Sequence, residues 1–110
     1  MKKPLMRHKI YPTAKLAIKE IWRHTEKNWG EKPADDYVRG LYDAITKIAD
    51  KRMLWRPVPH EQAQGVFFTR HEHHYIFFRE LSSGHLGIVS ILHKKMDLPA
   101  RLKNDLEQPS

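Results

Sequence analysis

Two stretches of the chain place apolar residues at steps of three and four, the spacing that puts side chains on one face of an α-helix. The first starts after Thr13, a common helix N-cap, and ends near Gly30. The second has Pro33 in its first turn, followed by Asp35 and Asp36, which suit the helix dipole. The stretches predict two amphipathic helices in an antiparallel hairpin. The positions on their apolar faces are Ala14, Ala17, Ile18, Ile21, Trp22, Thr25 and Trp29, then Ala34, Tyr37, Val38, Leu41, Tyr42, Ile45, Ile48 and Ala49.

Other parts of the chain carry the short runs of β-branched and aromatic residues that are typical of strands. Residues 5–11 predict a first strand, because Pro12 disfavours helix at the residue before it. Residues 52–65 hold two prolines without a sustained period and predict a loop. Three runs then predict an antiparallel meander, at residues 66–70, 75–79 and 86–93.

A last short helix is predicted by Leu98, Leu102 and Leu106, which are spaced at four-residue intervals behind Asp97, a suitable N-cap. The element order therefore predicts an α+β fold, with a helical hairpin packed on a small antiparallel sheet, over a single domain of residues 1–110. The run at 75–79 is apolar on both of its alternating sides, which predicts a central strand covered twice.

Charge and composition narrow the possible partners. With 20 Lys and Arg against 13 Asp and Glu, the net charge is +7, which favours an anionic partner or simply keeps the surface soluble. The absence of cysteine excludes disulfides, thiol nucleophiles and cysteine-based zinc sites. No apolar stretch is long enough for a signal peptide or a membrane span, so we expect a soluble cytoplasmic protein without a membrane partner.

The stretch HEHHYIFFRE is rich in histidine and raises the question of a metal site. On a strand, His71 and His73 would point to the same side and could begin such a site. A third ligand would have to come from His60, His85 or His93, and no spacing fixes its distance. We therefore interpret the histidines as the solvent-facing start of a strand and expect neither a metal nor another cofactor.

The element order, HEHHYIFF and the later GIVSILHKKMDLPARLKNDL together resemble the RelE/ParE superfamily of type II toxin-antitoxin toxins. The ParE branch, the plasmid stabilisation toxins, is the more similar one. Its members place a tyrosine in the penultimate strand and then an apolar strand ending in LH, a basic residue and an aspartate. The matching residues here are Tyr75, Leu92, His93, Lys95 and Asp97.

The resemblance implies a toxin that inhibits DNA gyrase by protein binding and performs no chemistry itself. It also implies a cognate antitoxin, ParD-like or of another class, that wraps the toxin. DNA would then be contacted only indirectly, through the antitoxin or gyrase.

The alternative implied by the RelE branch is ribosome-dependent cleavage of messenger RNA without a metal. Such cleavage needs proton-transferring groups and cations around the scissile phosphate. A set of that kind could form if its members converge on one face of the sheet, although the late tyrosine of many RelE-type nucleases is missing after Tyr75. The candidates are Arg70, Glu72, Arg79, His93 and Lys95, with Lys94 as a further cation.

Candidate partner-binding residues lie in two places. Trp55, with Met53 and Leu54, could form an exposed apolar patch or cap the edge of the core, whereas Trp22 and Trp29 fit the apolar face of the first helix. The second place is the last strand and the segment after it, with Tyr75 in the neighbouring strand. These candidates are Tyr75, His93, Lys94, Lys95, Met96 and Arg101.

Overall fold

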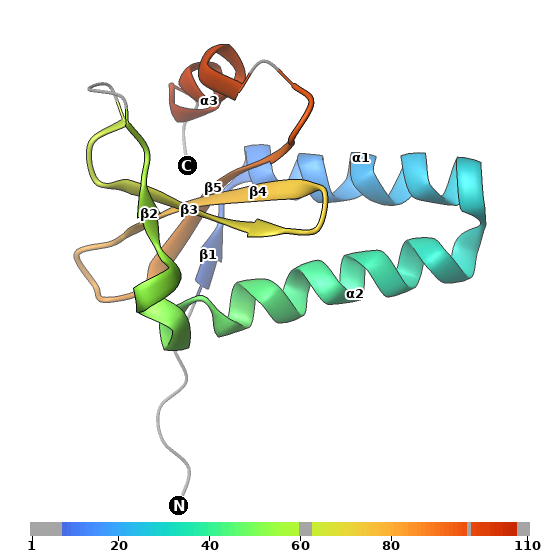
Figure 1. Ribbon diagram of the computed structural model, residues 1–110, viewed down its shortest axis with the longest axis horizontal. Helices are drawn as coiled ribbons and strands as arrows, with labels where there is room; N and C mark the ends of the chain where they lie inside the picture. Colours follow the sequence, from blue (N-terminus) through green and yellow to red (C-terminus); the bar gives the residue numbers. More distant parts are fainter. Residues whose placement is uncertain (1–7, 60–62, 97, 108–110) are drawn as a thin grey trace, which may run out of the picture.

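The computed structural model describes residues 8–59, 63–96 and 98–107 (Figure 1). Its elements are β1 (His8–Ile10), α1 (Pro12–Trp29), α2 (Glu31–Lys47), the 3-10 helix η1 (Ala49–Leu54), β2 (Arg56–Pro57), β3 (Val66–His71), β4 (His74–Glu80), β5 (Leu86–His93) and α3 (Leu98–Leu106). Within these ranges no helix is long and apolar enough to cross a membrane. The predicted C-terminal helix is confirmed, while its expected cap, Asp97, lies outside the described residues.

The strands form one five-stranded sheet in the order β1-β5-β4-β3-β2. The antiparallel pairing of β3, β4 and β5 confirms the predicted meander, and the α+β class is confirmed with it. The sheet is mixed rather than antiparallel throughout, because β1 runs parallel to β5. The pattern at residues 5–11 could indicate a strand but not its direction, which depends on the path of the hairpin that follows it. Of that run, residues 5–7 lie outside the described ranges.

The helical hairpin is joined by a single residue, Gly30, whose φ of 103° suits glycine. At its other end the prediction that Thr13 caps α1 is wrong. Tyr11 is the N-cap and Pro12 begins the helix, since proline lacks the N–H that the first turn cannot pair. The Thr13 hydroxyl instead donates a 2.7 Å hydrogen bond to the Val89 carbonyl, which ties α1 to β5.

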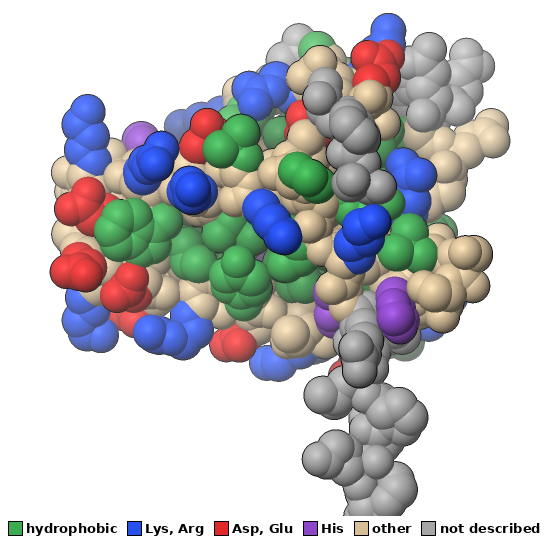
Figure 2. Space-filling model, turned by 180° about the vertical axis from the view of Figure 1, so that it is seen from behind, with side chains coloured by type: hydrophobic (Ala, Val, Ile, Leu, Met, Phe, Trp, Pro, Cys, Tyr) green, Lys and Arg blue, Asp and Glu red, His purple; other side chains and the backbone are tan. Residues whose placement is uncertain are grey.

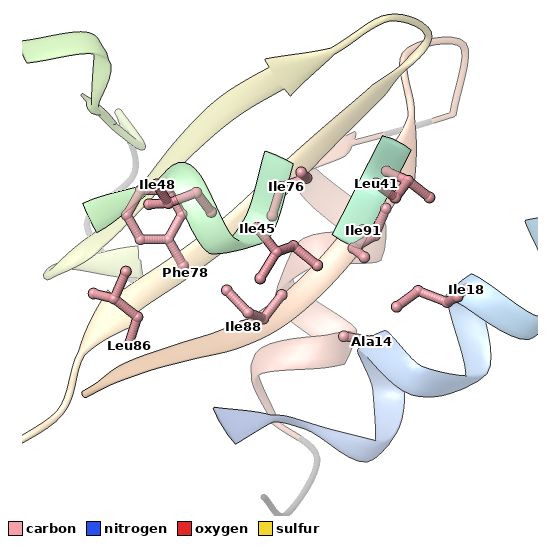
Figure 3. Close-up of a cluster of buried hydrophobic side chains, with 10 residues drawn as sticks. All are labelled: Ala14, Ile18, Leu41, Ile45, Ile48, Ile76, Phe78, Leu86, Ile88 and Ile91. Carbon is pink, nitrogen blue, oxygen red and sulfur yellow. The ribbon is translucent and has the colours of Figure 1, made fainter. Parts of the chain in front are cut away.

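The hairpin covers one face of the sheet and forms the main hydrophobic core with it (Figure 3). Side chains from α1 and α2 meet alternate residues of β4, as the period of two along a strand requires, and residues of β5 on both sides of an irregularity in its register. The buried members are Ala14, Ile18, Leu41, Ile45, Ile48, Ile76, Phe78, Leu86, Ile88 and Ile91.

Two tryptophans expected to pack on the hairpin behave differently. Trp22 is partly buried and its indole N–H donates a 2.8 Å hydrogen bond to Asp35. Trp29, at the end of α1, is 72% exposed, so it does not pack in the core, and packing at an interface stays a prediction for it. Seen from behind, apolar side chains remain visible along the hairpin with Lys and Arg side chains beside them (Figure 2).

The helix α3 covers the opposite face, where a second core forms from Ala63, Val66, Phe77, Val89, Leu92 and Leu102. β4, the middle strand, is therefore covered on both faces, as its pattern predicts. A bulge adds one residue to β5, since Phe77 pairs with Ser90 and Phe78 pairs with Ile88.

The segment predicted as a loop at residues 52–65 contains the end of η1 and the two-residue strand β2. Arg56 pairs with Phe68 and Pro57 with Phe67, at the outer edge of the sheet. Proline is tolerated there because an edge strand can leave its outward N–H position unpaired. The loop prediction therefore missed β2, because prolines are usually a sign of a loop and the local pattern does not indicate an edge strand.

We expect Phe78→Ala to lower the free energy of unfolding by about 3–5 kcal/mol, because it would leave a cavity where the side chain is fully buried. Leu16→Ala is the control, since Leu16 is 54% exposed and its truncation should change stability by under about 0.5 kcal/mol. Urea denaturation of both variants measures the difference. Similar losses in the two proteins would contradict the described core.

Candidate partner-binding groove

A groove of about 440 Å³ lies between α3 and the face of the sheet that β3 and β4 form. Its volume falls within the roughly 300–1,000 Å³ of ordinary binding pockets. Apart from Lys103 and Glu107, every side chain that lines it is apolar or aromatic. The other lining residues are Val58, Pro59, Ala63, Phe68, Tyr75, Phe77, Leu98, Pro99, Leu102 and Leu106.

Three aromatic rings form the floor of the groove. Phe68 and Phe77 are direct partners across β3 and β4, and Tyr75 lies two residues before Phe77, so all three face the same side. The rings of Phe68 and Tyr75 meet edge to face with centroids 5.6 Å apart. Tyr75, the tyrosine of the family pattern, therefore belongs to an apolar groove rather than to a cluster of titrating groups.

The helix α3 forms the wall, and a buried polar contact holds it in place. Ser90 of β5 is fully buried, and its hydroxyl donates a 2.6 Å hydrogen bond to the Asp105 carboxylate. Leu102 is the one buried residue of α3, whereas Leu98 and Leu106 are partly exposed along the groove. Because a buried hydroxyl without a partner would be costly, this contact fixes where α3 lies.

Exposed cations follow the chain from β5 into α3. Lys94, Lys95 and Arg101 are exposed, as is Lys103 at the groove itself. Met96 is 39% exposed in the same segment. Of the predicted partner-binding residues, Tyr75 thus lies in the floor of the groove. Four others, Lys94, Lys95, Met96 and Arg101, lie in α3 or in the segment that leads to it.

Trp55 lies on the other side of the sheet. Its ring packs edge to face on Phe78 with centroids 4.9 Å apart, and its indole N–H donates a 2.8 Å hydrogen bond to the Ile48 carbonyl. Trp55 was expected either to form an exposed apolar patch or to cap the edge of the core, and these contacts agree with the second interpretation. The neighbouring Met53 and Leu54 are 91% and 57% exposed, so they form the apolar surface of that segment.

The histidines of HEHH are divided by a tight turn. His71 ends β3 and His74 begins β4, while Glu72 between them has a φ of 52°. The expectation that His71 and His73 point to one side of a single strand is therefore wrong. Among residues 8–59, 63–96 and 98–107, no three histidine or acidic side chains are arranged to hold a metal.

His74 links this turn to the helical hairpin. Its Nδ1 lies 2.7 Å from the Tyr37 hydroxyl of α2, and the His93 ring meets it edge to face. Burial, and then the nearby His93 and His73, lower the pKa of His74 to about 4. Burial also lowers the pKa of His93, followed by the charges of His73 and the neighbouring lysines. His74 is therefore neutral at pH 7.

The residues proposed for RNA cleavage do not converge. The strand register puts His93 beside His74 on the hairpin side, whereas Arg70 lies beside Tyr75 on the groove side. Arg79 also faces the groove side, two residues beyond Phe77 on β4, and its Nε is buried without a hydrogen-bond partner among the described atoms. Lys95 contacts His93 through its backbone N–H. Glu72 lies in the turn, where its carbonyl accepts a hydrogen bond from Arg70.

Comparison with known families and proteins finds matches that cover most of the chain. The sequence profile of a family described as the ParE toxin of the type II toxin-antitoxin system parDE matches residues 9–98. Toxin ParE1 of Mycobacterium tuberculosis is 30% identical over 87% of this chain and 97% of its own length. Toxin ParE of Escherichia coli is 29% identical over 86% of this chain and 90% of its own.

Two solved structures share the fold. A chain from the chromosomal ParDE system of P. aeruginosa superposes with a TM-score of 0.67 at 19% identity, covering 81% of this chain and 96% of the other. A chain from the RelBE2 toxin-antitoxin complex of M. tuberculosis gives 0.51 at 14% identity, covering 86% and 98%.

Several residues of the groove escaped the sequence-based prediction. Val58, Phe68 and Leu106 are far apart in the chain, and each fits an ordinary loop, strand or helix pattern. The one available signal was the apolar character of both sides of β4, which implied a second covered face.

The free energy of unfolding should decrease as the pH is lowered, because His74 becomes protonated less readily in the folded protein than in the unfolded chain. Since its pKa is depressed in the folded state, its contribution is present above the ordinary value near 6.5 and is lost as pH falls toward about 4. We expect His74→Asn to reduce this loss by on the order of 1–2 kcal/mol, because partial exposure screens part of the effect.

Tyr37→Phe is the matched control for this pH dependence, because it removes the hydrogen bond but leaves His74 able to titrate. Urea denaturation between pH 7.5 and 4 measures both variants. Parallel curves for His74→Asn and the unmodified protein would contradict the assignment.

Proposed function

This chain belongs to the ParE toxin family of type II toxin-antitoxin systems, and we propose that it inhibits DNA gyrase by binding and is neutralised by a cognate, ParD-like antitoxin. Gyrase inhibition is typical of the family and needs no chemistry from the toxin. The site of action would be the cytoplasm. DNA would be reached only through gyrase or the antitoxin.

The groove beside α3 is the observation that carries the antitoxin part of the proposal. An amphipathic segment could bury its apolar side chains against Phe68, Tyr75 and Leu106. Acidic residues on the same segment would face Lys103 and the other cations of α3 and the segment before it. Apolar burial would supply most of the affinity, and charge would speed association.

Cleavage of messenger RNA is the less supported alternative. Its candidate groups are divided between the two faces of the sheet, with His93 on one and Arg70 and Arg79 on the other. A general acid and the cations for one phosphate have to lie within hydrogen-bond reach of the same substrate. The described arrangement therefore favours binding over catalysis.

We expect the purified toxin to inhibit gyrase supercoiling and to accumulate cleaved DNA complexes. Gyrase assays measure inhibition and cleaved DNA with the toxin alone and with toxin that has first been mixed with the antitoxin. Failure to inhibit at a large excess of toxin would refute the gyrase assignment. Toxin-dependent cuts in a message on translating ribosomes would establish the nuclease instead.

Leu106→Lys should weaken antitoxin binding at least about tenfold, because it places a charge in the apolar groove. Leu16→Lys makes the same change at an exposed leucine of α1 and should leave affinity unchanged. Titration calorimetry measures both variants, with thermal melting to confirm that each is folded. Equal affinities for the two would exclude the groove as the antitoxin site.

A further inference from the structure

The outer edge of the sheet is only partly covered. β3 extends from Val66 to His71, but β2 pairs with Phe67 and Phe68 alone. Val58 donates a hydrogen bond to the Val66 carbonyl, so alternate residues of β3 direct their backbone groups toward β2. By this alternation Arg70 directs its N–H and C=O outward, beyond the point where β2 stops. An open edge of this kind can pair with another extended chain.

The chain before β2 turns away from this edge. Continuing the pairing of Arg56 with Phe68 would set Leu54 opposite Arg70, yet Leu54 ends the 3-10 helix η1. Leu54 shares a cavity lining with Thr69 and Arg70 and is 57% exposed, and its chain neighbour Met53 is 91% exposed. The sequence therefore leaves both a vacant strand position and apolar side chains next to it.

A cavity of about 370 Å³ opens beside the same residues, between α2, η1 and β3. Thr69 and His71 line it from the strand, and Ala44, Ile48 and Leu54 from the helices. A Cβ on Gly40 would lie 3.3 Å from the His71 imidazole, so glycine at this position preserves the close approach of α2. An added strand would direct alternate side chains into this cavity.

The charges around the cavity favour an acidic occupant. Lys47 and Lys51 line it with their charges, against the single carboxylate of Asp43, while the Arg70 side chain lies on the other face of the sheet. A second copy of this chain would bring the same cations to the same edge, and like charges would then face each other across the pair. An acidic segment of another protein fits the edge better.

We propose that the free edge of β3 binds an extended segment of the antitoxin, which carries an apolar side chain for the cavity and acidic residues beside it. The segment pairs with the backbone of Arg70. Arg70 also lies next to Tyr75, at the groove on the opposite face, so one antitoxin chain can continue from the groove to the edge. This inference rests on the proposed function and adds a second, separate contact.

Two substitutions at one position test the backbone pairing. Arg70→Pro removes the outward N–H, the positive charge and the side-chain hydrogen bond to the Glu72 carbonyl, whereas Arg70→Gln removes the charge and the guanidinium contact but keeps the N–H. Neither breaks the hydrogen bonds between β3 and β4, because the Arg70 backbone faces away from β4. We expect antitoxin affinity to fall about tenfold or more for Arg70→Pro and only about twofold to threefold for Arg70→Gln.

Ala44→Phe provides an independent test at the cavity, since the larger side chain would fill it without altering the edge. It should also weaken binding about tenfold, and thermal melting checks the folding of all three variants. Hydrogen exchange of the toxin should show new protection of the Arg70 amide in the complex. Equal affinities of Arg70→Pro and Arg70→Gln, without that protection, would overturn the proposal, as would a toxin dimer formed through this edge.

The outcomes also separate this inference from the proposed function. If the unmodified toxin binds no antitoxin, the proposed function itself fails. If Leu106→Lys weakens binding and the Arg70 and Ala44 variants do not, the groove remains the antitoxin site and only the edge is excluded.

Discussion

The burial of β5 on both faces is the constraint on which the rest of the structure depends. Every residue from Leu86 to Leu92 is buried, and the strand lies between β1 and β4 in the sheet. Burial of this kind requires a cover on each side, because a strand apolar on both faces is stable only between two packed layers. The hairpin supplies one cover and α3 the other, and the Val89–Ser90 bulge adjusts the strand to both.

The two covers are unequal in length, and this inequality creates the apolar groove. The hairpin helices have 18 and 17 residues, whereas α3 has nine and buries one of them. So short a helix leaves Phe68, Tyr75 and Leu106 along an open groove. Apolar groups left uncovered in the free protein are available to a partner. The second core and the proposed antitoxin site are therefore parts of one incompletely covered face.

The candidate site could be predicted from the sequence only in part. Tyr75 and the cations from Lys94 to Arg101 were identifiable because they fall in a family pattern. The remaining lining of the groove was not, because Val58 and Phe68 meet α3 only through the folding of distant segments. The histidines were misleading, since a tight turn at Glu72 separates residues that a continuous strand would have aligned.

The sequence by itself determined the three α-helices and the strands of the meander, because the period of the apolar positions and the local backbone preferences act over a few residues. It also determined that the sheet would be covered twice, through the apolar character of both sides of β4. The direction of β1, the pairing of β2 and the separation of His93 from Arg70 were decided only by the tertiary structure. These features depend on the register between strands far apart in the chain, and a shift of one residue would move each side chain to the other face.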